Sequence, residues 1–179
     1  MITKLEQNKK PLILISRCLG FKACRYDGSM IEFNEINKLK EKFILKPICP
    51  EVAAGLGVPR PPIRLLALPD RKEIGYIFNG RWQIQTDILR KVIRIYLRRY
   101  NNTAGMILKE KSPSCGIKLC KYYRPPAAEI KGRTGGILIE EYTKLGLNWP
   151  FIDEVSFKNP NLRQKFIKKV KKYHKKIKP

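Results

Sequence analysis

Hydrophobic residues form three short uninterrupted runs, which predict strands over residues 11–16, 43–48 and 104–108. Central strands of a parallel sheet are buried on both faces, so they appear as apolar runs and not as an alternating pattern. These three segments are therefore the expected centre of a parallel sheet.

Between and after these runs, apolar positions recur with the period of an α-helix. The spacing predicts helices over residues 31–41, 87–100 and 136–145, with Thr86 as an N-cap and Gly146 as a helix end. Alternation of strands and helices predicts an α/β fold, a small parallel sheet flanked by helices in a Rossmann-like arrangement.

Two further apolar runs, residues 63–68 and 74–78, are bounded by turn residues and have no helical period. We expect them to form a short β-ribbon, joined at Pro69-Asp70 and ending at Asn79-Gly80, because such dipeptides favour turns. The Gly- and Pro-rich segment 49–62 is expected to be irregular.

The C-terminal segment, residues 156–179, has the pattern of a basic amphipathic helix. Asn159-Pro160 is an N-cap followed by a first-turn proline. One stripe is apolar: Leu162, Phe166, Val170, Tyr173 and Ile177. We expect this stripe to pack on the chain's own core; the start of a second domain or contact with RNA are the alternatives. The chain is divided accordingly into a domain over 1–155 and a helix or linker over 156–179.

The charge is strongly positive: 38 Lys and Arg against 15 Asp and Glu give a net charge of +23. Ten of the basic residues lie in the C-terminal segment, so the remainder still carries +13. Such an excess predicts binding to polyanions, nucleic acid first, with a lysine-rich genome as the alternative cause. No apolar run is long enough for a signal peptide or a membrane span, so a cytoplasmic protein that does not enter membranes is expected.

Three of the five cysteines follow the predicted strands, each inside a turn: Cys18, Cys49 and Cys115. Loops after the carboxyl ends of parallel strands converge on one crevice, so these thiols are expected to meet there. Three thiol ligands with one open position are typical of a catalytic metal or cluster site. Cys24 is interpreted as a bystander or a fourth ligand, and Cys120 as structural.

Polar residues beside these cysteines are candidates for chemistry. Glu51 lies two residues after Cys49 and is a candidate general base, or else a solvated surface residue. Ser112 and Ser114 could bind substrate or tune a cluster, or serve only the turn. Arg60, between prolines, suits an anion or carbonyl oxygen, or else pairs with Glu51 or Asp27. The only histidine, His174, lies in the basic tail, which disfavours a Cys-His mechanism.

Two other classes of protein are compatible with these residues. One is a basic RNA-binding module with a structural zinc site at Cys18, Cys24, Cys49 and Cys115, although the close cysteine pairs usual in such sites are absent. The other is a thiol redox protein, although no Cys-x-x-Cys lies in a suitable context.

Four ordered motifs resemble the thiouracil desulfidase (TudS) family. They are Ile15-Ser16-Arg17-Cys18-Leu19-Gly20, Cys24-Arg25-Tyr26-Asp27-Gly28, Cys49-Pro50-Glu51 followed by Gly55-Leu56-Gly57-Val58-Pro59-Arg60-Pro61-Pro62, and Lys111-Ser112-Pro113-Ser114-Cys115-Gly116. The resemblance covers most of residues 11–148.

The resemblance implies a [4Fe-4S] cluster with three cysteine ligands, carried over to Cys18, Cys49 and Cys115, and one open iron. It implies non-redox hydrolysis of C=S to C=O in thiolated uracil, with catalytic roles for Glu51 and Ser112. The candidate substrate-binding residues are Ser114, Arg60, Tyr26 and Asp27.

Residues 55–65 and 159–167 are similar to the two-domain, YbgA-type branch of that family, the tRNA 4-thiouridine desulfidases. The second domain of those proteins would begin where this sequence ends. Together with the charge, this resemblance implies 4-thiouridine in tRNA as the substrate, with free thiouracil or thiouridine as the alternative.

Overall fold

A four-stranded parallel sheet forms the centre of the structure, a computed structural model that describes residues 10–68, 71–124 and 129–177. In spatial order its strands are β2 (Ile44–Ile48), β1 (Leu12–Ser16), β6 (Thr103–Leu108) and β9 (Phe151–Asp153). The three predicted strands are confirmed as β1, β2 and β6. Strand β9 was not predicted, because three residues are too few to show a pattern.

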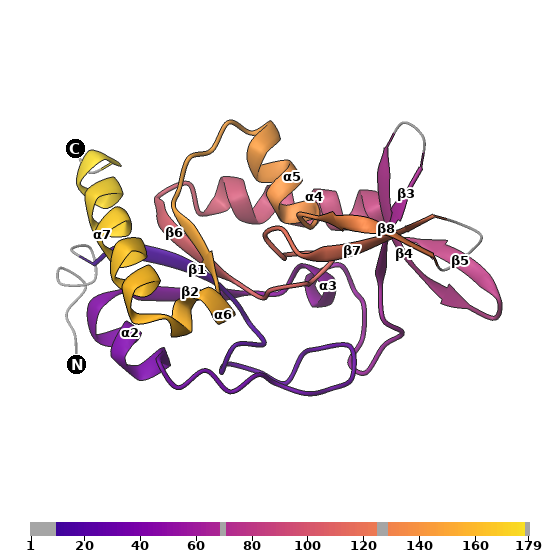
Figure 1. Ribbon diagram of the computed structural model, residues 1–179, viewed down its shortest axis with the longest axis horizontal. Helices are drawn as coiled ribbons and strands as arrows, with labels where there is room; N and C mark the ends of the chain where they lie inside the picture. The colour runs from indigo at the N-terminus through magenta and orange to yellow at the C-terminus, as the bar shows by residue number, and fades with distance from the viewer. Residues whose placement is uncertain (1–9, 69–70, 125–128, 178–179) are drawn as a thin grey trace.

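Helices cover both faces of this sheet, so the predicted α/β class is confirmed (Figure 1). One face carries α2 (Ile36–Lys42), α6 (Glu154–Lys158) and α7 (Pro160–Ile177), and the other carries α4 (Thr86–Arg99) and α5 (Ile137–Lys144). Strand β1 shows why both faces are apolar: Ile13 and Ile15 pack in one core cluster and Leu14 in the other.

A second, five-stranded sheet extends from one end of the molecule (Figure 1). Its spatial order is β5 (Arg81–Ile84), β4 (Lys72–Phe78), β3 (Arg64–Ala67), β7 (Cys120–Arg124) and β8 (Glu129–Thr134). The predicted ribbon is confirmed as antiparallel β3 and β4, and its joint at Pro69-Asp70 lies outside the described residues. Asn79 and Gly80, both at positive φ, form the turn of the β4–β5 hairpin.

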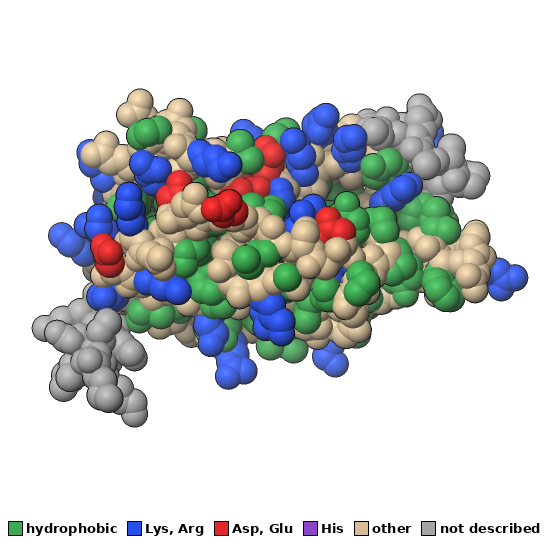
Figure 2. Space-filling view, turned by 90° about the horizontal axis from the view of Figure 1, so that it is seen from below, with side chains coloured by type: hydrophobic (Ala, Val, Ile, Leu, Met, Phe, Trp, Pro, Cys, Tyr) green, Lys and Arg blue, Asp and Glu red, His purple; other side chains and the backbone are tan. Residues whose placement is uncertain are grey.

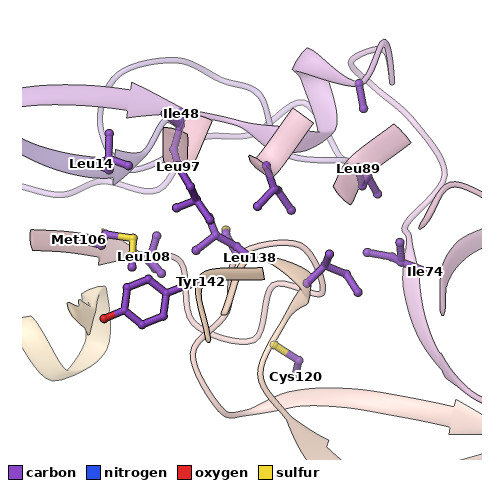
Figure 3. Packing of buried hydrophobic residues seen from close by; sticks show 14 of the residues in the cluster. Leu14, Ile48, Ile74, Leu89, Leu97, Met106, Leu108, Cys120, Leu138 and Tyr142 are labelled. Carbon is purple, nitrogen blue, oxygen red and sulfur yellow. The ribbon is translucent and has the colours of Figure 1, made fainter. Parts of the chain in front are cut away.

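One hydrophobic core joins the two sheets (Figure 3). Leu14 and Met106 of the parallel sheet and Ile74 of β4 belong to the same buried cluster as Leu97 of α4 and Cys120 of β7. The loops at the carboxyl ends of the parallel strands therefore lie beside a second sheet that shares a core with the first.

Three sequence-based predictions of local structure were wrong. Helix α2 begins at Ile36, not at residue 31, because Ile31 instead forms a parallel bridge with Leu19. Thr86 is the first residue of α4, not its N-cap, and its hydroxyl oxygen accepts a hydrogen bond from the Ile74 N–H at 2.9 Å. The segment expected to be irregular contains a short helix, α3 (Pro50–Ala53).

Helix α7 begins as predicted, since the Asn159 side-chain oxygen accepts hydrogen bonds from two backbone N–H groups of its first turn. Phe166 and Val170 are buried against β6, where a methyl group on Gly105 would come within 2.7 Å of Val170 Cγ2. The apolar stripe thus packs on the protein's own sheet, while Leu162 stays 46% exposed. None of the described helices has the length and apolarity needed to cross a membrane.

We expect Phe166→Ala to lower the free energy of unfolding by about 3–5 kcal/mol, because it leaves a cavity between α7 and β6. The matched control is Leu162→Ala on the same helix, with an expected change of about 0.5 kcal/mol. Urea unfolding followed by circular dichroism measures both, and equal effects of the two variants would contradict this packing.

Candidate active site

A cavity of about 520 Å³ opens at the carboxyl ends of β1, β2 and β6. The chain passes from β1 to β2 on one side of the sheet, and later from β6 to β9 on the other side. The two connections therefore lead away from the β1–β6 pair in opposite directions. Ligands bind in α/β sheets at such a switch point. Here the Lys109 N–H, just after β6, donates to the hydroxyl of Ser16, the last residue of β1, at 2.9 Å.

Cys18, Cys49 and Cys115 all line this cavity, so the strand pattern correctly predicted that the three thiols converge. Burial and the neighbouring thiols raise the pKa of Cys18 above its ordinary value. Burial likewise raises the pKa of Cys49 to about 12, opposed by a hydrogen bond with the Val52 backbone. Metal binding to these thiols would therefore have to displace protons.

The donor set fits an iron–sulfur cluster. Three soft sulfur ligands reach one cavity large enough for a group of several atoms, and thiolates are the usual ligands of such clusters. Across residues 10–68, 71–124 and 129–177, no three Cys, His, Asp or Glu side chains are gathered closely enough around one point for a single metal ion. A cubane takes its ligands from separate corners, and so from more widely spaced positions.

The other two cysteines occupy different surroundings. Cys24 is buried and lines the cavity, and burial raises the pKa of its thiol, opposed by a hydrogen bond with the Cys49 thiol. Cys120 does not line the cavity; it lies in the core, where its thiol donates to the Ser112 carbonyl oxygen at 2.9 Å. This contact agrees with a structural role for Cys120.

Glu51 is a buried carboxylate with both oxygens engaged. Arg60 donates to Oε2 from Nε at 2.9 Å and from Nη2 at 2.6 Å, while the Ser114 hydroxyl donates to Oε1 at 2.6 Å. The prediction that Arg60 pairs with an acid is confirmed, and the acid is Glu51. The alternative of a solvated Glu51 is excluded by its burial.

The two serines of the Cys115 turn continue this network. The Ser112 and Ser114 hydroxyl oxygens lie 3.0 Å apart. Since the proton of Ser114 is directed at Glu51, Ser112 is the donor to Ser114. Ser114 lines the cavity but is only 1% exposed, and its hydroxyl lies between Ser112 and Glu51.

The turn that carries Cys115 is tightly packed. A methyl group on Gly116 would lie 2.7 Å from the Ser112 carbonyl oxygen, so only glycine fits there. On the opposite side, the Ser16 hydroxyl lies 3.3 Å from the Cys115 sulfur. The thiol is thereby held between β1 and its own turn.

Several cavity residues were not singled out from the sequence. Ser16, Lys109 and Glu110 end or follow β1 and β6, so their position after a strand was an available signal. Glu154, which accepts from Lys109 Nζ and from the Glu110 N–H, both at 2.6 Å, gave no such signal because β9 is so short.

The two residues predicted from the second motif are placed differently. Tyr26 lines the cavity and is 43% exposed. Asp27 is not among the lining residues; it pairs with Arg25 at 3.4 Å and accepts from Ser29 at 2.6 Å, and that hydrogen bond lowers the pKa of its carboxyl. The structure thus gives Asp27 a role in the local turn rather than in the cavity.

The cavity is lined by more cations than anions. Besides Arg60, its basic residues are Arg17, Arg25, Arg64, Lys109 and Lys111, whereas its acids are Glu51 and Glu110. A negatively charged ligand is favoured by such a lining.

Comparison with known proteins identifies the family. The model of the 2-thiouracil desulfurase family matches residues 13–150, which contain all the predicted site residues. The chain belongs to this family. An uncharacterized protein, YbbK of Bacillus subtilis (strain 168), is 32% identical over 114 residues, covering 59% of this chain and 73% of YbbK.

The fold of this 2-thiouracil desulfurase family member also matches a solved structure, described as the [4Fe-4S]-dependent thiouracil desulfidase TudS. The TM-score is 0.66 at 24% identity, and the match covers 88% of this chain and 99% of the other. The parallel sheet with its flanking helices is therefore the architecture of that solved protein too.

The ion pair of Glu51 and Arg60 provides a stability test in this family member. We expect Arg60→Met to lower the free energy of unfolding by about 3–5 kcal/mol, because it leaves a buried carboxylate without its partner. The double variant Arg60→Met/Glu51→Leu should recover most of that loss. Urea unfolding of the metal-free protein measures both, and a single variant within about 1 kcal/mol of wild type, as for exposed ion pairs, would contradict the burial of the pair.

Proposed function

We propose that this protein is a [4Fe-4S]-dependent desulfidase that replaces sulfur by oxygen in thiolated uracil, without oxidation or reduction. The observation that carries the proposal is the convergence of Cys18, Cys49 and Cys115 on one cavity beside the buried carboxylate of Glu51. Membership of the 2-thiouracil desulfurase family supports it, as does the likeness in fold to a [4Fe-4S]-dependent enzyme.

The three converging thiols would hold the cluster and leave one iron without a protein ligand. When bound, such a cluster supplies a thiophilic Lewis acid, which polarises C=S in preference to C=O. Ser16 and the tight Cys115 turn fix the position of one of these thiols. Thiolated uracil then enters through the open side of the cavity, beside Tyr26.

Hydrolysis needs a water molecule to lose a proton as its oxygen attacks the ring carbon. The network offers a path for that proton: the Ser112 hydroxyl accepts it while passing its own proton to Ser114, and Ser114 passes a proton to Glu51 Oε1. Glu51 is the base, and the two serines carry the proton to it. The water oxygen stays on the carbon as the new carbonyl oxygen, and the second water proton leaves with the sulfur as hydrosulfide. Atoms and electrons therefore balance without a reductant.

Arg60 keeps this base in position. Its guanidinium binds Glu51 Oε2 and also donates to the Gly57 and Cys24 carbonyl oxygens at 3.0 and 3.2 Å. Because all these partners are fixed, Oε1 stays directed at Ser114. Arg60 therefore serves as a positioning residue, rather than as the substrate contact expected from the sequence.

For the substrate we propose 4-thiouridine in tRNA. The net charge of +23 and the cationic lining of the cavity support a polynucleotide over a neutral free base. Free thiouracil or thiouridine is the alternative substrate, but neither has the phosphate groups that this positive charge would bind.

Protein purified without oxygen should contain about four iron and four sulfide ions per chain. Cys49→Ala should lose the cluster because a ligand is removed, whereas Cys24→Ala, the matched control, should keep its iron. Iron and acid-labile sulfide assays with a visible spectrum measure this. Zinc in place of iron, or no metal after anaerobic reconstitution, would contradict the proposal.

Glu51→Gln should keep the cluster and slow turnover of 4-thiouridine by about 10²- to 10⁴-fold, because the amide cannot accept the proton from Ser114. Sulfide release measures the rate, and iron content verifies that the cluster is intact. Glu35→Gln, at the start of α2, is the control and should match wild type. Normal turnover by Glu51→Gln would remove Glu51 from the role of base.

A further inference from the structure

The five-stranded sheet has one face in the core and one face turned outward. Pairing in the sheet places Leu65, Ile74 and Tyr122 on one face, and all three pack in or against the core cluster. Side chains alternate along a strand, so the opposite face is set by the same register. It carries Arg64, Leu66, Glu73, Ile77, Trp82, Ile84, Lys121, Tyr123 and Arg133.

This outer face exposes apolar side chains. Ile77 and Ile84 are each 46% exposed, and Trp82 lies directly opposite Ile77 and is partly exposed. Leu66, in the centre of the face, is buried. Neighbouring exposed apolar and aromatic side chains on a sheet are typical of a binding surface.

The same face carries net positive charge, because its acid Glu73 pairs with Arg71 at 2.9 Å while Arg64, Lys121 and Arg133 are all basic. Lys121 and Arg133 are directly opposite each other on β7 and β8, and both are exposed. Like charges opposite each other destabilise a sheet, and an anion between them relieves the repulsion. In Figure 2, hydrophobic and basic side chains intermingle on the end of the molecule that holds this sheet, while the acidic ones in view lie nearer its middle and other end.

The outer face is continuous with the candidate active site. Arg64 and Tyr123 stand on it with the Arg64 guanidinium 5.1 Å from the centre of the Tyr123 ring, and both also line the cavity. A chain bound across the sheet would therefore lead directly to the cysteines.

We propose that the outer face of the five-stranded sheet binds the single-stranded RNA that flanks the thiolated base. The inference deepens the proposed function and rests on it. Bases stack on Trp82 and Tyr123, while Lys121 and Arg133 contact phosphates. Stacking on a sheet needs bases freed from a helix, so the surface selects single strands over duplexes.

Binding to a fluorescein-labelled single-stranded RNA, with a duplex of the same sequence for comparison, tests the surface in the full-length protein. Trp82→Ala should weaken binding at least about fivefold, and Trp82→Phe should retain most of it, because a ring remains for stacking. Lys121→Glu/Arg133→Glu should reduce the slope of log Kd against log salt by about 1.4, the value for two lost phosphate contacts.

The matched control is Lys168→Glu/Lys172→Glu on exposed positions of α7, at the other end of the molecule (Figure 1). It changes the net charge equally and should reduce binding less than the sheet variant. Thermal melting of each variant verifies that it folds. If Trp82→Ala does not fold, the Lys121/Arg133 variant decides the test.

Turnover separates this inference from the proposed function. The Lys121/Arg133 variant should keep wild-type turnover of free 4-thiouridine and lose kcat/KM only on thiolated RNA. Unchanged RNA binding, equal binding of duplex, or equal affinity for polyglutamate would each overturn the inference and leave the proposed function standing. Absence of turnover on every thiolated substrate with RNA binding as expected would overturn the proposed function instead.

Discussion

The buried ion pair between Glu51 and Arg60 holds the site loops together. Glu51 belongs to α3, just after β2, and through Ser114 it is attached to the turn that carries Cys115. Arg60 reaches the Cys24 and Gly57 carbonyl oxygens, and its own N–H donates to the Tyr26 carbonyl oxygen at 2.8 Å. Charges removed from water need nearly every hydrogen bond satisfied, and satisfying these bonds fixes four segments in one arrangement.

The shared core supports this arrangement from below. Because the parallel sheet and the five-stranded sheet pack around the same cluster, the loops between them have little freedom to separate. Cys120 illustrates the connection: it begins β7, lies in the core, and donates to the backbone of the Cys115 turn. A residue of the second sheet thus helps to position a candidate ligand that belongs to the first.

The sequence revealed the parts of the structure that depend on strong local patterns. Continuous apolar runs indicated β1, β2 and β6, and the rule that ligands gather at their carboxyl ends correctly brought three thiols together. Strands β5, β7 and β8 were not predicted, because their sequences mix charged, aromatic and small residues. Their stability comes from pairing with distant segments.

The site itself was predictable only in outline. Motifs marked Glu51, Ser112 and Ser114, but their order in the proposed proton path depends on a hydrogen bond between segments more than sixty residues apart. Arg60 was recognisable as a special arginine, whereas its contact with Glu51 was one of several open alternatives. Glu154 lies outside every motif and reaches the site only through tertiary packing.

Glu154 also lies at the predicted division of the chain into a domain over 1–155 and a helix over 156–179, and its contacts connect the two parts. Its carboxylate clamps the backbone at Glu110, while the helix it begins, α6, buries Phe157 beneath α7, ring to ring with Phe166. The C-terminal helix is therefore connected, through α6, to the loop leading to Ser112. Loss of the basic tail would uncover Phe157, in the same short helix as the residue that holds the Glu110 backbone, so the tail contributes packing beside the candidate site as well as charge.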